Sequence, residues 1–181
     1  MKKSATLAII ATAALAGVLV LAYLVYDHTH ISRPVRSCLS SLINNPIVTD
    51  EQGRSTLAEV RGYASTSRDW QLVNALADSI ENADKAGSLS GQSGYENAQV
   101  FDKFYEAGRE DAYALSNADP EVVRLRSAAC SAQLRSLSDL ALIGDAVGTP
   151  ATTFKPSAQQ AWESLGYTGS PSACNVMTAS K

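Results

Sequence analysis

The sequence predicts an all-α protein: a single N-terminal transmembrane helix followed by an extracytoplasmic bundle of about four main helices. Three observations lead to this prediction. The chain opens with a long uncharged apolar run, its later apolar residues recur at helical spacing, and Gly or Pro separates the segments. No alternating run of Val, Ile and Thr suggests a sheet, and the apolar stripes are too broad and Ala-rich for a sustained coiled coil.

The transmembrane anchor is expected at residues 4–26, after a cytoplasmic stub of residues 1–3. This segment contains no charge, and as a helix it would span about 35 Å, enough for a hydrocarbon core of roughly 30 Å. A cleaved signal peptide is the alternative, because Ala14-Leu15-Ala16 resembles a cleavage motif. Lys2 and Lys3 place the N-terminus in the cytoplasm. We therefore expect a single-pass membrane protein whose C-terminal domain is periplasmic or extracellular.

The helical bundle is expected over residues 27–144, and its first half contains three predicted helices. One begins near Pro34 and stops at Asn44-Asn45-Pro46. A short helix is expected over residues 55–64. A third follows a cap at Ser67 and ends at Gly87, with Val73, Leu76, Ala77 and Ile80 in its apolar stripe.

Residues 87–94, GSLSGQSG, consist of turn formers and predict a flexible connector before a helix over residues 95–115. Asp119-Pro120-Glu121 then marks a helix start, with a cap, a proline in the first turn and an acid near the positive end of the helix dipole. That helix is expected to run to Ile143 and to end at Gly144. Residues 145–181 should form a loop, a short helix and a polar C-terminal tail.

Both histidines lie where the apolar run ends. Asp27, His28 and His30 have side chains suitable for a metal, but two histidines separated by one residue point about 200° apart on a helix. Cys38 lies a helix away, beyond Pro34. We therefore interpret this stretch as the boundary of the anchor, and predict no metal site and no cofactor.

Catalytic motifs are weak. Asp102, Glu106 and Glu110 share a predicted helical face with basic neighbours, as a solvated, salt-bridged face does. A separate set, Glu121, Cys130 and Ser136, resembles the Glu, Asp or Cys, and Thr pattern of lysozyme-type phage endolysins, a resemblance that implies peptidoglycan cleavage. Ser stands where that pattern has Thr, and all three residues fall within one predicted helix. We predict no catalytic residues.

Two further groups of residues have structural interpretations. The three cysteines allow one internal disulfide, and Cys130–Cys174 is the preferred pairing because the last helix can return along the Asp119–Ile143 helix. An aromatic stripe is expected to form bundle core or an interaction face; its members are Trp70, Phe101, Phe104 and Tyr105.

These features favour association over catalysis. The expected function is a membrane-anchored accessory module that binds or positions partners, with the lipid bilayer and other membrane or envelope proteins as its neighbours. A net charge of −3 without clustered Lys and Arg argues against nucleic acid as a partner. The alternative function is a membrane-tethered or membrane-released peptidoglycan hydrolase.

Overall fold

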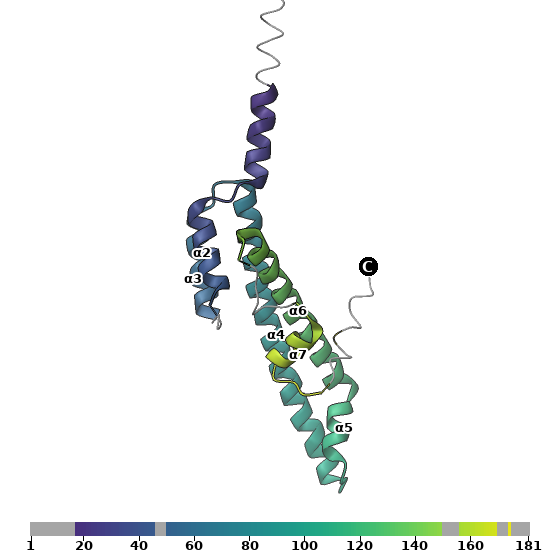
Figure 1. The fold of residues 1–181 in the computed structure, drawn as a ribbon. Helices are drawn as coiled ribbons and strands as arrows, with labels where there is room; N and C mark the ends of the chain where they lie inside the picture. Colours follow the sequence, from purple (N-terminus) through teal and green to yellow (C-terminus); the bar gives the residue numbers. More distant parts are fainter. Residues whose placement is uncertain (1–16, 46–49, 150–155, 170–173, 175–181) are drawn as a thin grey trace, which may run out of the picture.

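The computed structural model describes residues 17–45, 50–149, 156–169 and 174, and almost all of them lie in helices. A helix over residues 17–29 projects from one end of the body (Figure 1). The labelled helices of the body are α2 (Arg33–Ile43), α3 (Asp50–Tyr63), α4 (Ser67–Glu106), α5 (Ala112–Ala118), α6 (Pro120–Val147) and α7 (Ala158–Ser164).

The long helices α4 and α6 form an antiparallel pair that runs the length of the body (Figure 1). Ser79 on α4 hydrogen-bonds Ser136 on α6, and this contact sets the register. The same register places Ala86, seven residues after Ser79, opposite Ala129, seven residues before Ser136. Both alanines are fully buried. We call Ser79, Ala86, Ala129, Ala132 and Ser136 the small-residue seam, since small side chains let two helices approach closely.

The predicted connector at residues 87–94 is wrong, because α4 passes through it without a break. The buried residues of α4 recur every seven positions through this stretch, at Ala86, Ser93 and Val100, so one face packs continuously. Gly87, Gly91 and Gly94 lie on the exposed side, with open space around them. Packing along the partner helix therefore overrides the local preference of Gly and Ser for turns.

The main hydrophobic core lies at the end of the body nearest the projecting helix. There the α2–α3 hairpin packs beside the α4–α6 pair (Figure 1). The core is aliphatic: Val35, Leu39, Val60, Leu72 and Ile143 are all fully buried. Helix α3 begins at Asp50, earlier than the sequence indicates, and places acidic residues in its first turn.

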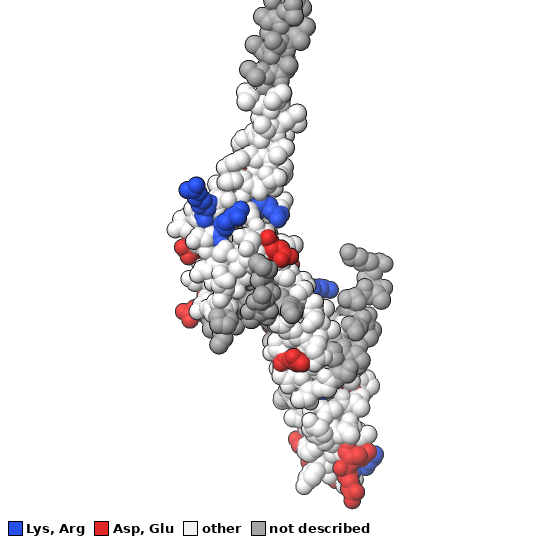
Figure 2. Space-filling view, viewed as in Figure 1, with Lys and Arg blue, Asp and Glu red and all other residues white. Residues whose placement is uncertain are grey.

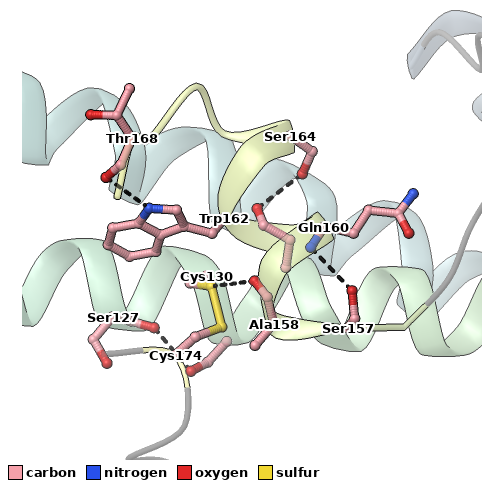
Figure 3. Close-up of a disulfide and its surroundings, with 11 residues drawn as sticks. Ser127, Cys130, Ser157, Ala158, Gln160, Trp162, Ser164, Thr168 and Cys174 are labelled. Atoms are coloured by element: carbon pink, nitrogen blue, oxygen red, sulfur yellow. Dashed lines mark hydrogen bonds between the residues drawn. A yellow bond between two sulfur atoms is a disulfide. The ribbon is translucent and has the colours of Figure 1, made fainter. Parts of the chain in front are cut away.

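A second, smaller core lies farther along the pair, where α7 packs on α6. The structure joins Cys130 of α6 to Cys174 by a disulfide, with a Cα–Cα distance of 5.4 Å (Figure 3). Trp162 of α7 is buried beside it, and its indole Nε1–H donates to the Thr168 carbonyl at 3.2 Å. Tyr167 lies against Trp162, with ring centroids 4.7 Å apart.

Helix α6 begins at Pro120 as predicted, with the Asp119 carboxylate accepting from the backbone N–H groups of Glu121 and Val122. Its predicted end at Gly144 is wrong. Gly144 is buried within the helix, and α6 continues to Val147. It stops at Gly148, whose φ of 77° is left-handed and therefore favours glycine.

The membrane predictions are overturned. Among the helices that the structure describes, none combines the length and the apolar character needed to cross a bilayer. Residues 1–16, including the first part of the predicted anchor at 4–26, lie outside the described residues. The predicted transmembrane anchor and the predicted single-pass membrane localisation are therefore not supported.

Candidate functional site

The projecting helix over residues 17–29 is the most unusual surface of the described chain. Its large apolar side chains are 45–66% exposed, and no other described element covers them. The exposed set consists of Val18, Leu19, Val20, Leu21, Tyr23, Leu24, Val25 and Tyr26. Because these residues follow one another with only Ala22 between them, they occupy every side of the helix rather than one stripe. A helix that is apolar all round is normally buried.

Charge is absent from this helix until its last turn. No Lys, Arg, Asp or Glu occurs between residue 17 and Asp27. Figure 2 shows an uncharged visible face along the described part of the helix, with basic side chains gathered where the helix meets the body. Arg33, Arg36 and Arg61 belong to the helix ends at this junction, and none of them forms an ion pair with another described residue.

The direction of the projecting helix is set by hydrogen bonds to the start of α4. The Asp27 carboxylate accepts from the backbone N–H and the hydroxyl of Ser67. The Thr66 hydroxyl donates to the His30 carbonyl at 2.8 Å. The hydrogen bonds from Ser67 lower the pKa of Asp27, so this carboxyl is ionised at neutral pH. Two side chains thus attach the base of the helix to the body.

Asp69 is the buried centre of this junction. Its side chain is fully buried, and one oxygen accepts from the Ser32 backbone N–H at 2.9 Å. The other oxygen accepts from the N–H groups of Ser65 and Thr66, at 3.0 and 3.2 Å. Burial alone raises the pKa of Asp69, but the hydrogen bonds from Ser65, Ser32 and Thr66 outweigh it and leave the pKa below its ordinary value.

The sequence contains a capping signal for this junction, one residue before the predicted cap. Ser67 was expected to be the cap of the third helix, but the cap is Thr66. The Thr66 hydroxyl accepts from the Asp69 N–H, and the Asp69 carboxylate accepts from the Thr66 N–H. Thr-Ser-Arg-Asp is thus a capping box with Asp in its third helical position. The bond to Ser32, far away in sequence, has no local signal.

The histidine stretch lies at the base of the projecting helix. The His30 ring stacks on Tyr26, with centroids 4.4 Å apart, and Asp27 is engaged by Ser67. Within the described ranges, no group of three or more His, Cys, Asp or Glu side chains could hold a metal ion. Cys38 is a free, half-buried thiol, and its pKa is raised by burial and, next, by Glu59.

The aromatic residues proposed from the sequence do not belong to either buried cluster. Trp70 is 47% and Tyr105 69% exposed, whereas Phe101 and Phe104 are half-buried. Phe101 and Tyr105 stack on each other one turn apart, with centroids separated by 5.8 Å. The core is aliphatic instead, because α2, α3 and α6 supply Leu, Ile and Val to the α4 face that carries Leu72 and Leu76.

The endolysin-like residues are engaged in structural contacts. All three lie on α6, but each faces a different neighbour. Glu121 is paired with Arg124, at 2.6 Å, and this guanidinium lowers the Glu121 pKa. Cys130 is in the disulfide, and Ser136 is hydrogen-bonded to Ser79. The structure therefore does not bring these residues together into one cleft.

The carboxylates at the far end of the body are likewise separate. Helix α4 ends at Glu106, so Glu110 lies beyond it and the predicted shared face is interrupted. Arg109 pairs with Asp111, at 2.9 Å, rather than with a carboxylate of that face. Asp102, Glu106 and Glu110 are all exposed.

Comparison with known protein families, curated proteins and solved structures finds no match. A proposed function must therefore rest on the residues of this chain alone. The exposed helix with its fixed base is the feature that most requires an explanation.

Proposed function

We propose that this protein is an accessory module that binds a protein partner through the helix of residues 17–29, and that the body positions this helix. The observation that supports the proposal is the ring of exposed apolar side chains on a helix whose base is fixed by Asp27, Thr66 and Asp69. Covering this surface removes apolar area from water, a favourable contribution of about 25 cal/mol for each Å² that is offset in part by the entropy cost of association.

The chemistry of the helix restricts the partner. An uncharged apolar helix fits a partner that surrounds it with apolar side chains, either in a deep groove or between helices. Three arginines at its base form no ion pair with a described residue and favour carboxylates at the rim of that groove: Arg33, Arg36 and Arg61. The proposed partner is therefore a different protein with an apolar groove and an acidic rim.

Site-specific photo-crosslinking in the native host tests this proposal. A photoreactive residue at Leu21 or Val25 should give one major protein adduct. The same residue at Tyr95, which is equally exposed but lies on α4, should give little of it. The adduct should decrease when Arg33 and Arg36 are changed to Glu. Adducts that form equally at all three positions, with lipid alone, or only with a second copy of this chain would overturn the proposed partner.

Substitution separates binding from folding. With the photoreactive residue placed at position 24, changing Leu21 and Val25 together to Asn should abolish the protein adduct. The thermal unfolding of the body should not change, because neither side chain contacts the core. The matched control changes Val123 and Leu142 to Asn, which are exposed apolar residues of α6. This control should retain the adduct.

The peptidoglycan hydrolase is tested in parallel. Changing Glu106, Glu110 or Glu121 individually to Gln should leave partner capture intact. If the purified protein degrades peptidoglycan and one of these changes abolishes that activity, the association proposal is wrong.

A further inference from the structure

A cavity of about 280 Å³ lies where the α2–α3 hairpin meets the α4–α6 pair, and none of its lining residues belongs to the projecting helix. Engineered cavities of about 150 Å³ accept benzene, and natural ligand pockets begin near 300 Å³. The space therefore suits a molecule of one or two fused rings. Its wall is largely aliphatic and includes Leu42, Leu76, Ile80, Leu137 and Leu140.

Gly53 on α3 keeps one side of this cavity open. A Cβ added there would contact Ile80 Cγ1 at 3.5 Å, an ordinary van der Waals distance, so alanine fits and a longer side chain would extend into the space. Gly53 is buried, whereas Gly62 on the same helix is exposed and has nothing near it. The two glycines form a matched pair for testing the cavity.

The two serine hydroxyls in the wall offer acceptors, beside the side-chain amide of Gln133, which can donate and accept. Ser79 Oγ lies 3.2 Å from the Ser136 carbonyl and 3.0 Å from Ser136 Oγ. When Ser79 donates to that carbonyl and Ser136 donates to Ser79, both hydroxyl hydrogens are used within the pair. Three hydroxyl lone pairs remain, since each hydroxyl oxygen has two. The pair can then accept a hydrogen bond from a ligand but has none left to donate.

The charges at the mouth also disfavour an anion. Asp50 and Asp84 line the opening, and Arg54 bridges them, with its Nε 3.0 Å from Asp50 and its terminal nitrogen paired with Asp84. One guanidinium between two carboxylates leaves a net negative charge at the mouth of the cavity. A ligand carboxylate would enter against that field, and in the wall the Ser79–Ser136 pair has no hydrogen left for it, which leaves only the side-chain amide of Gln133 as a donor.

We infer that this cavity binds a small, uncharged aromatic or cyclic molecule that carries one N–H or O–H donor, of the indole or phenol class. The rings contact the leucines and Ile80, and the donor reaches the Ser79–Ser136 hydroxyl pair. Arg54 joins α3 to α4 beside the site through its ion pairs with Asp50 and Asp84. This site is independent of the helix proposed to bind a protein partner.

Titration of the full chain by calorimetry and amide NMR tests the inference, with indole, toluene and benzoate as probes. Indole should bind saturably and shift amide signals of the cavity wall. Toluene should bind more weakly, and benzoate should not bind. Gly53→Ala should weaken indole binding, and Gly53→Leu should abolish it. Gly62→Leu, the matched control, should bind as the unmodified protein does.

A second variant tests the hydrogen bond. Ser79→Ala should weaken indole binding about fivefold, the effect of one ordinary hydrogen bond, while toluene binding is unchanged. Equal affinity for toluene and indole in the unmodified protein would overturn the assigned donor. Failure of indole to saturate, or binding unaffected by Gly53→Leu in a variant that circular dichroism shows to be folded, would overturn the site itself.

Discussion

The two ends of the α4–α6 pair are stabilised by different means. At the end near the projecting helix, α2 and α3 add a layer of Leu, Ile and Val to the pair. Farther along, the added elements are the short helices α5 and α7, each of which buries only two residues. There the disulfide, the Trp162 indole and polar contacts hold the structure together. Arg126, for example, bonds Asn117 at 2.9 Å and lies over the Tyr167 ring.

This difference shows how the chain compensates for the small apolar area that small residues bury. The small-residue seam brings α4 and α6 close but buries few methylene groups, and each buried methylene contributes only about 0.8 kcal/mol. Where a second aliphatic layer is present, apolar burial is sufficient. Where it is absent, a covalent link limits the freedom of the unfolded chain instead. Variants at the two ends should therefore respond differently to denaturant and to reductant.

The largest expected effect is at the aliphatic end. Leu39→Ala should lower the free energy of unfolding by about 2–5 kcal/mol, because Leu39 is fully buried among residues of the main core. Leu142→Ala, on an exposed face of α6, is the control and should change stability little. Urea unfolding followed by circular dichroism measures both. Equal losses for the two variants would contradict the assignment of the main core.

The disulfide should have the next largest effect. Changing Cys130 and Cys174 together to Ala should cost about 2–4 kcal/mol, since the bond closes a loop across 44 positions of sequence. Reductant should reproduce the loss in the unmodified protein and have no effect on the variant. Amide hydrogen exchange should increase first in α7, with α2 and α3 still protected. Exchange that increases uniformly would show that the two ends are one cooperative unit.

Asp69→Asn should have a smaller effect, about 1–3 kcal/mol, on the junction. An Asn amide directs N–H donors toward backbone groups that are donors themselves, so one side of the contact becomes repulsive. Loss of protection at Ser32 and Thr66 in hydrogen exchange would locate the effect. If Asp69→Asn is as stable as the unmodified protein, the carboxylate does not hold the junction.

The pH dependence of stability provides a separate test of Asp69. Its folded pKa is lowered, so its stabilisation is complete above the unfolded value of about 3.9 and is lost as the pH falls through the folded pKa. Asp139 has the opposite sign, because burial and, next, Asp78 raise its pKa and its ionisation opposes folding. Between about pH 5 and 3, Asp69→Asn should flatten the loss of stability and Asp139→Asn should steepen it.

The smallest expected effect is a gain. Gly87→Ala and Gly91→Ala should each stabilise the protein by about 0.5–1 kcal/mol, since both glycines are helical and have room for a Cβ. Gly148→Ala is the contrasting variant and should be destabilising, because its φ is positive. Thermal unfolding measures all three. Destabilisation by Gly87→Ala would argue that α4 is not a continuous helix there.

The sequence by itself determined the features that depend on neighbouring residues. Pro120 with Asp119 before it specifies the start of α6, because the cap and the first turn lie within four positions. The helical class follows from apolar spacing in the same local way. The apolar character of residues 17–26 is also plain from the sequence, but its interpretation as a membrane span was wrong.

Tertiary structure alone decided the features that depend on distant partners. The Gly- and Ser-rich stretch of α4 has a local preference for turns, and only continuous packing along that helix keeps it helical. Asp69 receives its bond from Ser32, 37 positions away, and the cavity exists because Gly53 comes to lie against Ile80 of another helix. Contacts of this kind depend on how helices pair in space, and no local pattern of residues encodes that pairing.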